Sequence, residues 1–226
     1  MRARLNNVER AILKELSVEE FANTITHGFG LALSIVGFVV LVAMASFRGG
    51  PLLIASCVVY GASLVVLYAA STCYHGTTCP VRKRRLQIVD HCCIYLLIAG
   101  SYTPFGLILL GGSFGQGLLA FIWVFAVIGI LAKLALRNRF PAIAVVSYVV
   151  MGWIGVFAVQ PLLAALGLVP IALVVAGGIA YTVGVIFFAW HRLPHNHAIF
   201  HVFVLAGSVL HYTAIALYVV PYVVNS

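Results

Sequence analysis

Seven long apolar segments constrain the fold of this chain more than any other feature of its sequence. They lie at roughly 28–47, 52–73, 88–110, 116–136, 142–162, 169–190 and 198–220. Each is about 20 residues long, the length that a helix needs to cross a hydrocarbon core of about 30 Å. Charged residues make up only 8% of the chain, too few to cover a water-soluble domain. The sequence therefore predicts an all-α membrane protein, with one domain of seven transmembrane helices over 27–226.

The basic residues predict the orientation of these helices, because Lys and Arg accumulate in cytoplasmic loops. With the N-terminus in the cytoplasm, every Lys and Arg except Arg48 falls on the cytoplasmic side. Seven spans then place the C-terminus outside, in a multi-pass protein of the inner (plasma) membrane. This asymmetry, with contacts to anionic lipid head groups, accounts for the net charge of +8, so no nucleic-acid partner is expected.

Residues 1–26 are expected to form a cytoplasmic segment that is not a cleavable signal peptide, because no small-residue cleavage pattern follows them. Leu5, Val8, Ile12 and Leu16 recur at spacings of three and four with charges between them. That periodicity is typical of an amphipathic helix on the membrane surface. A solvated leader is the alternative that the residues leave open.

Polar side chains are rare in the spans, and they gather in one predicted layer of the membrane. Asp90 is the only acidic residue beyond position 20, and it begins the third span. Ser71 and His75 end the second span, whereas His197 and His201 begin the seventh. All five positions are cytoplasmic ends in the predicted topology. Ionisable residues at membrane depth are costly and mark functional sites, so this layer is the candidate site.

The histidines of this layer predict a metal site. His197 and His201 stand four residues apart, which places both on one helix face. Pro194 ends the preceding helix and Asn196 is a favourable N-cap, so both histidines are expected in the first helical turns. Such a pair can hold one metal ion, with His75 as a third ligand. Three histidines and an open position are typical of catalytic zinc, whereas structural zinc sites usually have four protein ligands.

The neighbouring polar residues have site roles and simpler alternatives. Asp90 would hold a metal-bound water or take its proton, since zinc lowers the pKa of that water to about 7. Ser71 could instead donate to the carbonyl four residues earlier. Glu20 could either belong to the site or close a capping box at the start of a helix. Asn23 and His27 share the helix face of Glu20 and are expected to support the site.

Other candidate ligands have ordinary structural explanations. His91 and His211 fit hydrogen-bonded interior or interfacial histidines. The five cysteines match no familiar zinc or redox spacing, and most are expected to pack as small apolar residues.

Taken together, these motifs resemble the hemolysin III branch of the progestin and adipoQ receptor family. The residues that carry the likeness are Glu20-x-x-Asn23-x-x-x-His27, Ser71-x-x-Tyr74-His75, Asp90-His91 and His197-x-x-x-His201, with a supporting His211 ten residues further on. The resemblance implies a seven-span, N-inside fold and a zinc ion held by three of these residues, His75, His197 and His201. It also implies that Asp90 holds the zinc-bound water beside Ser71. The wider superfamily includes alkaline ceramidases, which implies metal-assisted hydrolysis.

The sequence leaves three classes of function open. The leading one is a zinc-dependent hydrolase of a lipid amide or ester, with Asp90 as general base and Ser71 as a weak candidate for the oxyanion donor. The zinc could instead be structural. A second class is non-enzymatic: an ion or proton relay, or a role in membrane energetics or lipid homeostasis. The third is the cytolysin that the branch name implies, although seven apolar spans oppose a soluble secreted form. Neither the substrate nor the oligomeric state follows from the sequence.

Overall fold

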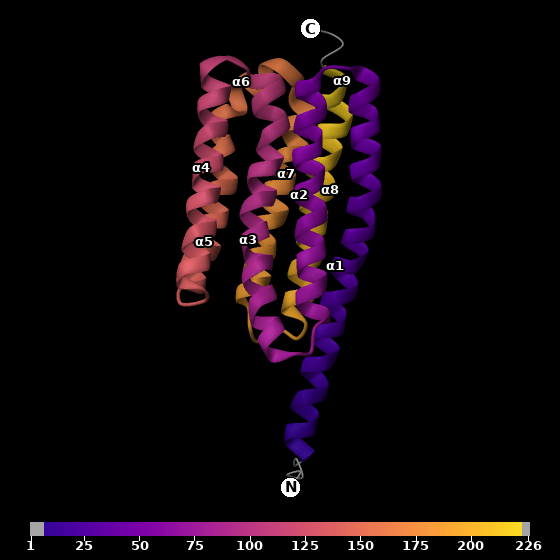
Figure 1. Ribbon diagram of the computed structural model, residues 1–226, viewed down its shortest axis with the longest axis vertical. Coiled ribbons are helices and arrows are strands. Elements are labelled where there is room, and N and C mark those ends of the chain that lie inside the picture. Colours follow the sequence, from indigo (N-terminus) through magenta and orange to yellow (C-terminus); the bar gives the residue numbers. More distant parts are fainter. Residues whose placement is uncertain (1–6, 223–226) are drawn as a thin grey trace.

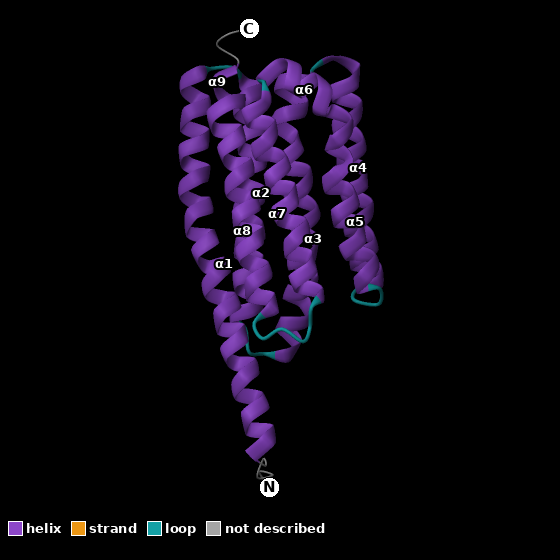
Figure 2. Ribbon diagram, turned by 180° about the vertical axis from the view of Figure 1, so that it is seen from behind, coloured by secondary structure: helices purple, strands orange, loops and turns teal. Residues whose placement is uncertain are grey.

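The computed structural model describes residues 7–222, and the side chains from residue 18 onward. Within that part of the chain every regular element is helical, and seven helices are long and apolar enough to cross a membrane. The helices stand side by side in one bundle, with α1 and the α4–α5 pair at opposite edges (Figure 1). Short loops join them at the two ends (Figure 2). The expected all-α fold of seven spans is confirmed.

Several spans are assembled from successive helical segments. The described elements, in chain order, are α1 (Asn7–Arg48), α2 (Pro51–Gly76), α3 (Pro80–Pro104) with the π-helix η1 (Phe105–Leu110), α4 (Gly112–Leu136), α5 (Pro141–Trp153) with the 3-10 helix η2 (Ile154–Ala158) and α6 (Val159–Leu166), α7 (Leu168–Ala189), and α8 (Asn196–Ala214) with the π-helix η3 (Ile215–Val219) and α9 (Val220–Tyr222).

Proline and glycine set the boundaries of these helices. α2, α3 and α5 each begin with proline at the first helical position, where the missing N–H has no helical partner to lose. Between α1 and α2, Gly49 and Gly50 have φ angles of 82° and 88°, which glycine adopts without steric cost. The chain therefore reverses sharply between long, straight helices.

The first helix extends well beyond the predicted span. α1 is unbroken from Asn7 to Arg48, because no proline or glycine interrupts it before Gly28. Of this helix, Val18–Arg48 is long and apolar enough to be the membrane span. The expected amphipathic surface rests on Leu5, which lies outside the described residues, and on Val8, Ile12 and Leu16, whose side chains also lie outside them. That surface helix therefore stays a prediction.

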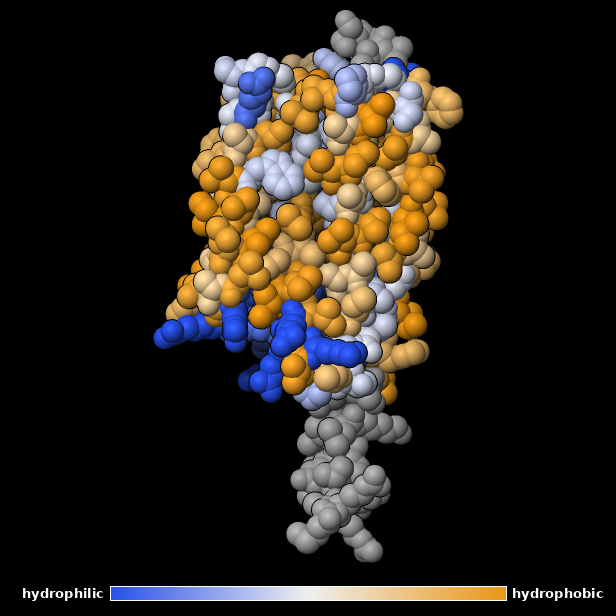
Figure 3. Space-filling model, viewed as in Figure 1, coloured by the Kyte–Doolittle hydropathy of each residue, from blue (hydrophilic) through white to orange (hydrophobic). Residues whose placement is uncertain are grey.

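Basic side chains gather at one end of the bundle, below a broad apolar surface (Figure 3). They come from the first turns of α3, the α4–α5 turn and the α7–α8 loop, and include Arg82, Lys83, Arg84, Arg85, Arg137, Arg139 and Arg192. We call this the basic end. Large exposed hydrophobic residues cover the sides of the bundle, as a surface in contact with lipid tails requires. The chain is thus a multi-pass protein embedded in a lipid bilayer.

Small residues allow the helices to approach closely, as is usual in membrane bundles. A Cβ atom at Gly61 on α2 would overlap the Phe38 ring of α1, and one at Gly129 on α4 would overlap the Tyr95 ring of α3. The Tyr95 ring has little freedom to move away, because it is buried and its hydroxyl lies 2.7 Å from Ser147 Oγ.

Gly129→Ala is therefore expected to lower the thermal unfolding midpoint of the protein in detergent. The added methyl group overpacks the α3–α4 contact, which typically costs about 1–3 kcal/mol. Gly117→Ala is the matched control on the same helix, since beyond the adjacent backbone of its own helix no described atom lies within 4 Å of its Cβ position. Alanine there should leave the midpoint unchanged or raise it slightly. Equal shifts in the two variants, measured by circular dichroism, would contradict this account of the α3–α4 contact.

Candidate metal centre

Three histidines come together near the basic end. His75 lies in the last turn of α2, and His197 and His201 lie in the first turns of α8. One ring nitrogen from each lies within 4.8 Å of the others. The His75 ring centroid is 4.9 Å from that of His197 and 5.0 Å from that of His201, and the last two are 4.6 Å apart. These three side chains could bind one metal ion.

The start of α8 differs from the prediction. His195, with a left-handed φ of 56°, is the N-cap, and Asn196 is the first helical residue, so the expected Asn196 N-cap is wrong. The Asn196 side chain instead donates to the carbonyls of Phe187 and Phe188, at 3.3 and 3.0 Å. It therefore satisfies the end of α7 rather than the start of α8. These bonds join α7 to the helix that carries two of the three histidines.

A carboxylate orients His75. Glu20 Oε2 on α1 lies 2.8 Å from His75 Nδ1 and 2.9 Å from Lys83 Nζ. An ionised carboxylate only accepts hydrogen bonds, so His75 Nδ1 carries the hydrogen and Nε2 keeps its lone pair. His75 Nε2 is buried and has no hydrogen-bond partner among the described residues. A histidine held by a carboxylate on one nitrogen and free on the other is the usual arrangement of a metal ligand.

The same contacts decide between the two roles that the sequence left open for Glu20. A capping box needs a helix that starts at Ser17, but α1 begins at Asn7 and continues through this segment. The backbone N–H groups there have intrahelical partners, so no side-chain cap is required. Glu20 is therefore no helix cap, and it contacts the histidine cluster through His75.

His201 is oriented by a hydroxyl group from α1. Its Nδ1 lies 3.2 Å from Thr26 Oγ1. The Thr26 hydroxyl donates its single hydrogen to the backbone carbonyls of Ala22 and Asn23, at 2.9 and 3.0 Å. It therefore accepts from His201 Nδ1, which leaves the Nε2 lone pair of His201 for a metal.

His27 reaches this cluster from α1, and Asn23 lies about one turn before it on the same helix. The His27 ring stacks on the His201 ring, with centroids 3.4 Å apart and planes inclined by 17°. Both ring nitrogens of His27 and Oδ1 of Asn23 are buried without a hydrogen-bond partner among the described residues. Neither residue joins the three histidines whose nitrogens converge.

Asp90 and Ser71 line a cavity together with His197 and His201. The simpler role considered for Ser71 is not observed, because no hydrogen bond joins its buried Oγ to the carbonyl of Leu67. Its neighbour Thr72 makes that kind of bond instead, to the Tyr68 carbonyl at 2.7 Å. The Ser71 hydroxyl faces the Asp90 carboxylate, which lines the same cavity.

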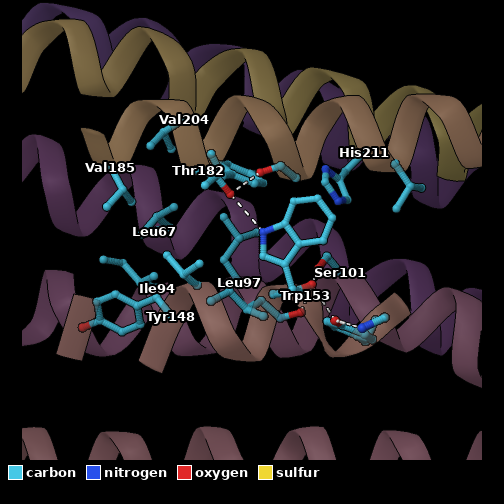
Figure 4. A pocket seen from close by; sticks show the side chains of 18 of the residues that line it. Leu67, Ile94, Leu97, Ser101, Tyr148, Trp153, Thr182, Val185, Val204 and His211 are labelled. Carbon is cyan, nitrogen blue, oxygen red and sulfur yellow. Dashed lines mark hydrogen bonds between the residues drawn. The ribbon is translucent and has the colours of Figure 1, made fainter. Parts of the chain in front are cut away.

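The cavity has a volume of about 320 Å³ and is lined mostly by apolar side chains, with residues from all seven spans. Figure 4 shows this lining, which includes Leu67, Ile94, Leu97, Val185 and Val204. Its polar groups are few, so the space suits a hydrocarbon chain.

His211 lies apart from the three-histidine cluster. Ten residues of helix separate it from His201, or about 15 Å along the axis. It lines a deeper part of the cavity beside Trp153, whose indole donates to Thr182 Oγ1 at 3.0 Å (Figure 4). His211 Nδ1 lies 2.9 Å from the Gly207 carbonyl. His211 therefore does not contact the three-histidine cluster, and its expected supporting role stays a prediction.

Two contact residues escaped the sequence analysis. Lys83 belongs to a basic run that is fully explained by membrane orientation, and Thr26 is an ordinary hydroxyl residue within an apolar helix. No sequence motif around either residue points to the site. Lys83 contacts Glu20 and Thr26 contacts His201, and in each case the partner lies on another helix.

The fold and this site define a seven-helix integral membrane protein with a candidate metal centre at its basic end. Residues 17–212 match the family described as Haemolysin-III related, and the chain belongs to that family. The placement expected from the motifs is confirmed.

Similar proteins cover nearly the whole chain. Hemolysin-3 of Bacillus cereus is 45% identical over 203 residues, which are 90% of this chain and 93% of that protein. The Hemolysin-3 homolog of Bacillus subtilis (strain 168) is 43% identical over 202 residues, 89% of this chain and 95% of the other. Monocyte to macrophage differentiation factor of Homo sapiens is 29% identical over 210 residues, 89% of this chain and 85% of that protein.

Proposed function

We propose that this protein is a zinc-dependent hydrolase of a lipid amide or ester. The observation that carries the proposal is the cluster of His75, His197 and His201, beside Asp90 and an apolar cavity. No fourth ligand from His, Cys, Asp or Glu joins the cluster among the described residues. Three histidines with an open position are typical of catalytic zinc.

The residues present fit such an ion. Glu20 and Thr26 hold the Nδ1 atoms of two histidines, so both Nε2 lone pairs are free to coordinate. When bound, zinc supplies Lewis acidity and makes water nucleophilic near neutral pH. Asp90 is placed to act as general base, the group that would take a proton from the attacking water. The Ser71 hydroxyl, beside Asp90, can donate to the developing oxyanion, and the cavity holds the acyl chain.

The location proposed for this reaction is the cytoplasmic side of the plasma membrane. The basic end carries the three histidines and nearly all the Lys and Arg residues of the loops, and Lys and Arg mark the cytoplasmic side. A lipid substrate would then come from the inner leaflet.

A non-enzymatic relay is the second candidate, and one group of hydrogen bonds favours it. The hydroxyls of Tyr68 and Tyr181 lie 2.9 and 3.0 Å from Ser208 Oγ, and the Tyr68 ring contacts His27. Polar contacts thus continue from the cluster into the middle of the bundle. The hydrolase is favoured because free histidine nitrogens serve a metal directly, whereas a relay needs a path to the far end of the bundle as well.

The direct test is product formation by purified, zinc-loaded protein. Lipid amides and esters with matched acyl chains would be incubated with the protein in neutral detergent, and the released fatty acid measured by mass spectrometry. We expect release that stops when a chelator removes zinc and resumes when zinc is restored. Protein that carries zinc but releases nothing from the whole set would contradict the hydrolase and favour a structural ion.

Glu20→Gln is expected to weaken zinc binding by about 10–100-fold, the usual effect of losing an outer-shell partner of a ligand. The amide cannot hold the His75 Nδ1 hydrogen as firmly as a carboxylate does. Glu19→Gln is the control, because it removes the same charge from a neighbouring position on a different side of α1. The measurement is competition for zinc with a chromophoric chelator. Equal losses in both variants would indicate a general charge effect.

A further inference from the structure

Lys133 is a cation buried in the wall of the cavity. Its side chain lies in the last turn of α4 and the residue is only 5% exposed. Among the side chains from 18 to 222, no other Lys or Arg is buried. Lysines near the ends of membrane helices normally extend outward and keep the ammonium group in water. Lys133 instead turns into the protein, so orientation in the membrane does not explain it.

The hydrogen bonds of Lys133 are incomplete. Its Nζ donates to Asn138 Oδ1 at 2.8 Å, and the Asn138 amide donates to Gln87 Oε1 on α3. An ammonium group has three hydrogens, so two of them have no partner among the described residues. The ion pairs found in that part of the chain both involve Glu20, and neither includes Lys133. A buried charge is costly unless it is paired, so this position is suited to an external anion.

Lys133 also shares the cavity with the groups proposed for hydrolysis. It lines the same space as Asp90, Ser71 and His201. No ion pair joins Lys133 to Asp90 among the described residues, although both side chains line the cavity. An amphiphile whose acyl chain fills the apolar part of the cavity could therefore place its head group between these residues.

We propose that Lys133 is a specificity-determining residue that selects amphiphiles with an anionic head group, either a carboxylate or a phosphate. The inference rests on the proposed function, because it assigns the head group of the lipid bound in the same cavity. A lysine that serves only to tie the α4–α5 turn to α3, through Asn138 and Gln87, would confer no such preference.

The test is binding by chelator-treated protein in neutral detergent, since a bound metal would itself attract anions. Two pairs of probes separate the sources of the anion: tetradecanoate against tetradecanol, and lysophosphatidate against lysophosphatidylcholine of the same chain length. Dissociation constants would be measured by displacement of a fluorescent acyl probe from the wild type and from Lys133→Gln and Lys133→Arg. Arg139→Gln is the matched control, an exposed basic residue of the adjoining α4–α5 turn.

We expect the wild type to bind the anionic member of at least one pair about tenfold more tightly, the contribution of a charge-assisted hydrogen bond. Lys133→Gln should abolish that preference, Lys133→Arg should keep most of it, and Arg139→Gln should leave it unchanged. Preference in the carboxylate pair assigns a fatty acid head group, and preference in the phosphate pair assigns a phospholipid head group.

Two results would overturn the proposal: a wild type without anion preference, or a preference that folded Lys133→Gln retains. The first needs no variant, so it decides the matter even when Lys133→Gln does not fold. Hydrolysis of neutral lipids by zinc-loaded protein without anion preference would refute only the role of Lys133. Anion preference in a protein that hydrolyses nothing would refute only the hydrolase.

Discussion

Replacing His201 with alanine should abolish metal binding. The wild type, purified without chelators, is expected to carry about one zinc ion per chain, and His201→Ala to carry almost none. His201 is 2% exposed, its Nδ1 lies 3.2 Å from Thr26 Oγ1, and it is one of the three ligands whose nitrogens converge. With one ligand lost, only His75 and His197 remain. Elemental analysis of the purified proteins measures the result.

His211→Ala is the matched control for this experiment. His211 lies on the same helix and lines the same cavity, but it is outside the converging cluster. Its removal should leave the zinc content unchanged. Zinc that persists in His201→Ala would place the metal elsewhere, and a wild type without stoichiometric metal would refute the zinc hydrolase. In that case the relay through Asp90 and the histidines becomes the better hypothesis.

Asp90→Asn should reduce turnover by about 10²–10⁴-fold while leaving the zinc content nearly intact. Asparagine preserves the shape of the side chain but cannot accept a proton from the attacking water. Asp90 is not one of the three converging ligands, so metal binding does not depend on it directly. The measurement is kcat with the lipid identified in the activity screen, together with elemental analysis of the same preparation.

Two further variants test whether Asp90 acts as the general base. Ser71→Ala should lower kcat less than Asp90→Asn does, because a single oxyanion donor is lost while the general base remains. Asp90→Glu keeps a carboxylate and should restore part of the activity. Full activity in Asp90→Asn would exclude proton transfer to this side chain. Loss of zinc in Asp90→Asn would instead indicate that the carboxylate helps to hold the metal.

The sequence predicted the membrane fold because the bilayer imposes strong and local constraints. A backbone in hydrocarbon must satisfy its hydrogen bonds within each helix, so apolar length alone identifies the spans. The spacing of His197 and His201 likewise predicted their relative positions, since residues four apart share a face in any α-helix. The common layer of His75 and these two residues followed from the order of the spans.

Predictions from local sequence failed or stayed open where a side chain could bind more than one partner equally well. Asn196 is a good N-cap in isolation, yet its amide binds the end of α7 because that helix terminates within reach. Glu20 fits a capping box as well as a metal site, and the choice depended on whether α1 begins before it. Both cases turn on neighbours that are remote in sequence or on the length of an entire helix.

Apolar spans, basic loops and histidine spacing were thus enough to predict a seven-helix protein with a candidate metal site near one membrane face. The partners of the site required the folded bundle: Glu20 on His75, Thr26 on His201, and Lys133 in the wall of the cavity. These contacts depend on how each helix rotates about its axis and how closely it approaches the next one. Those quantities are fixed by packing among all the helices, including small residues such as Gly129, and no single segment encodes them.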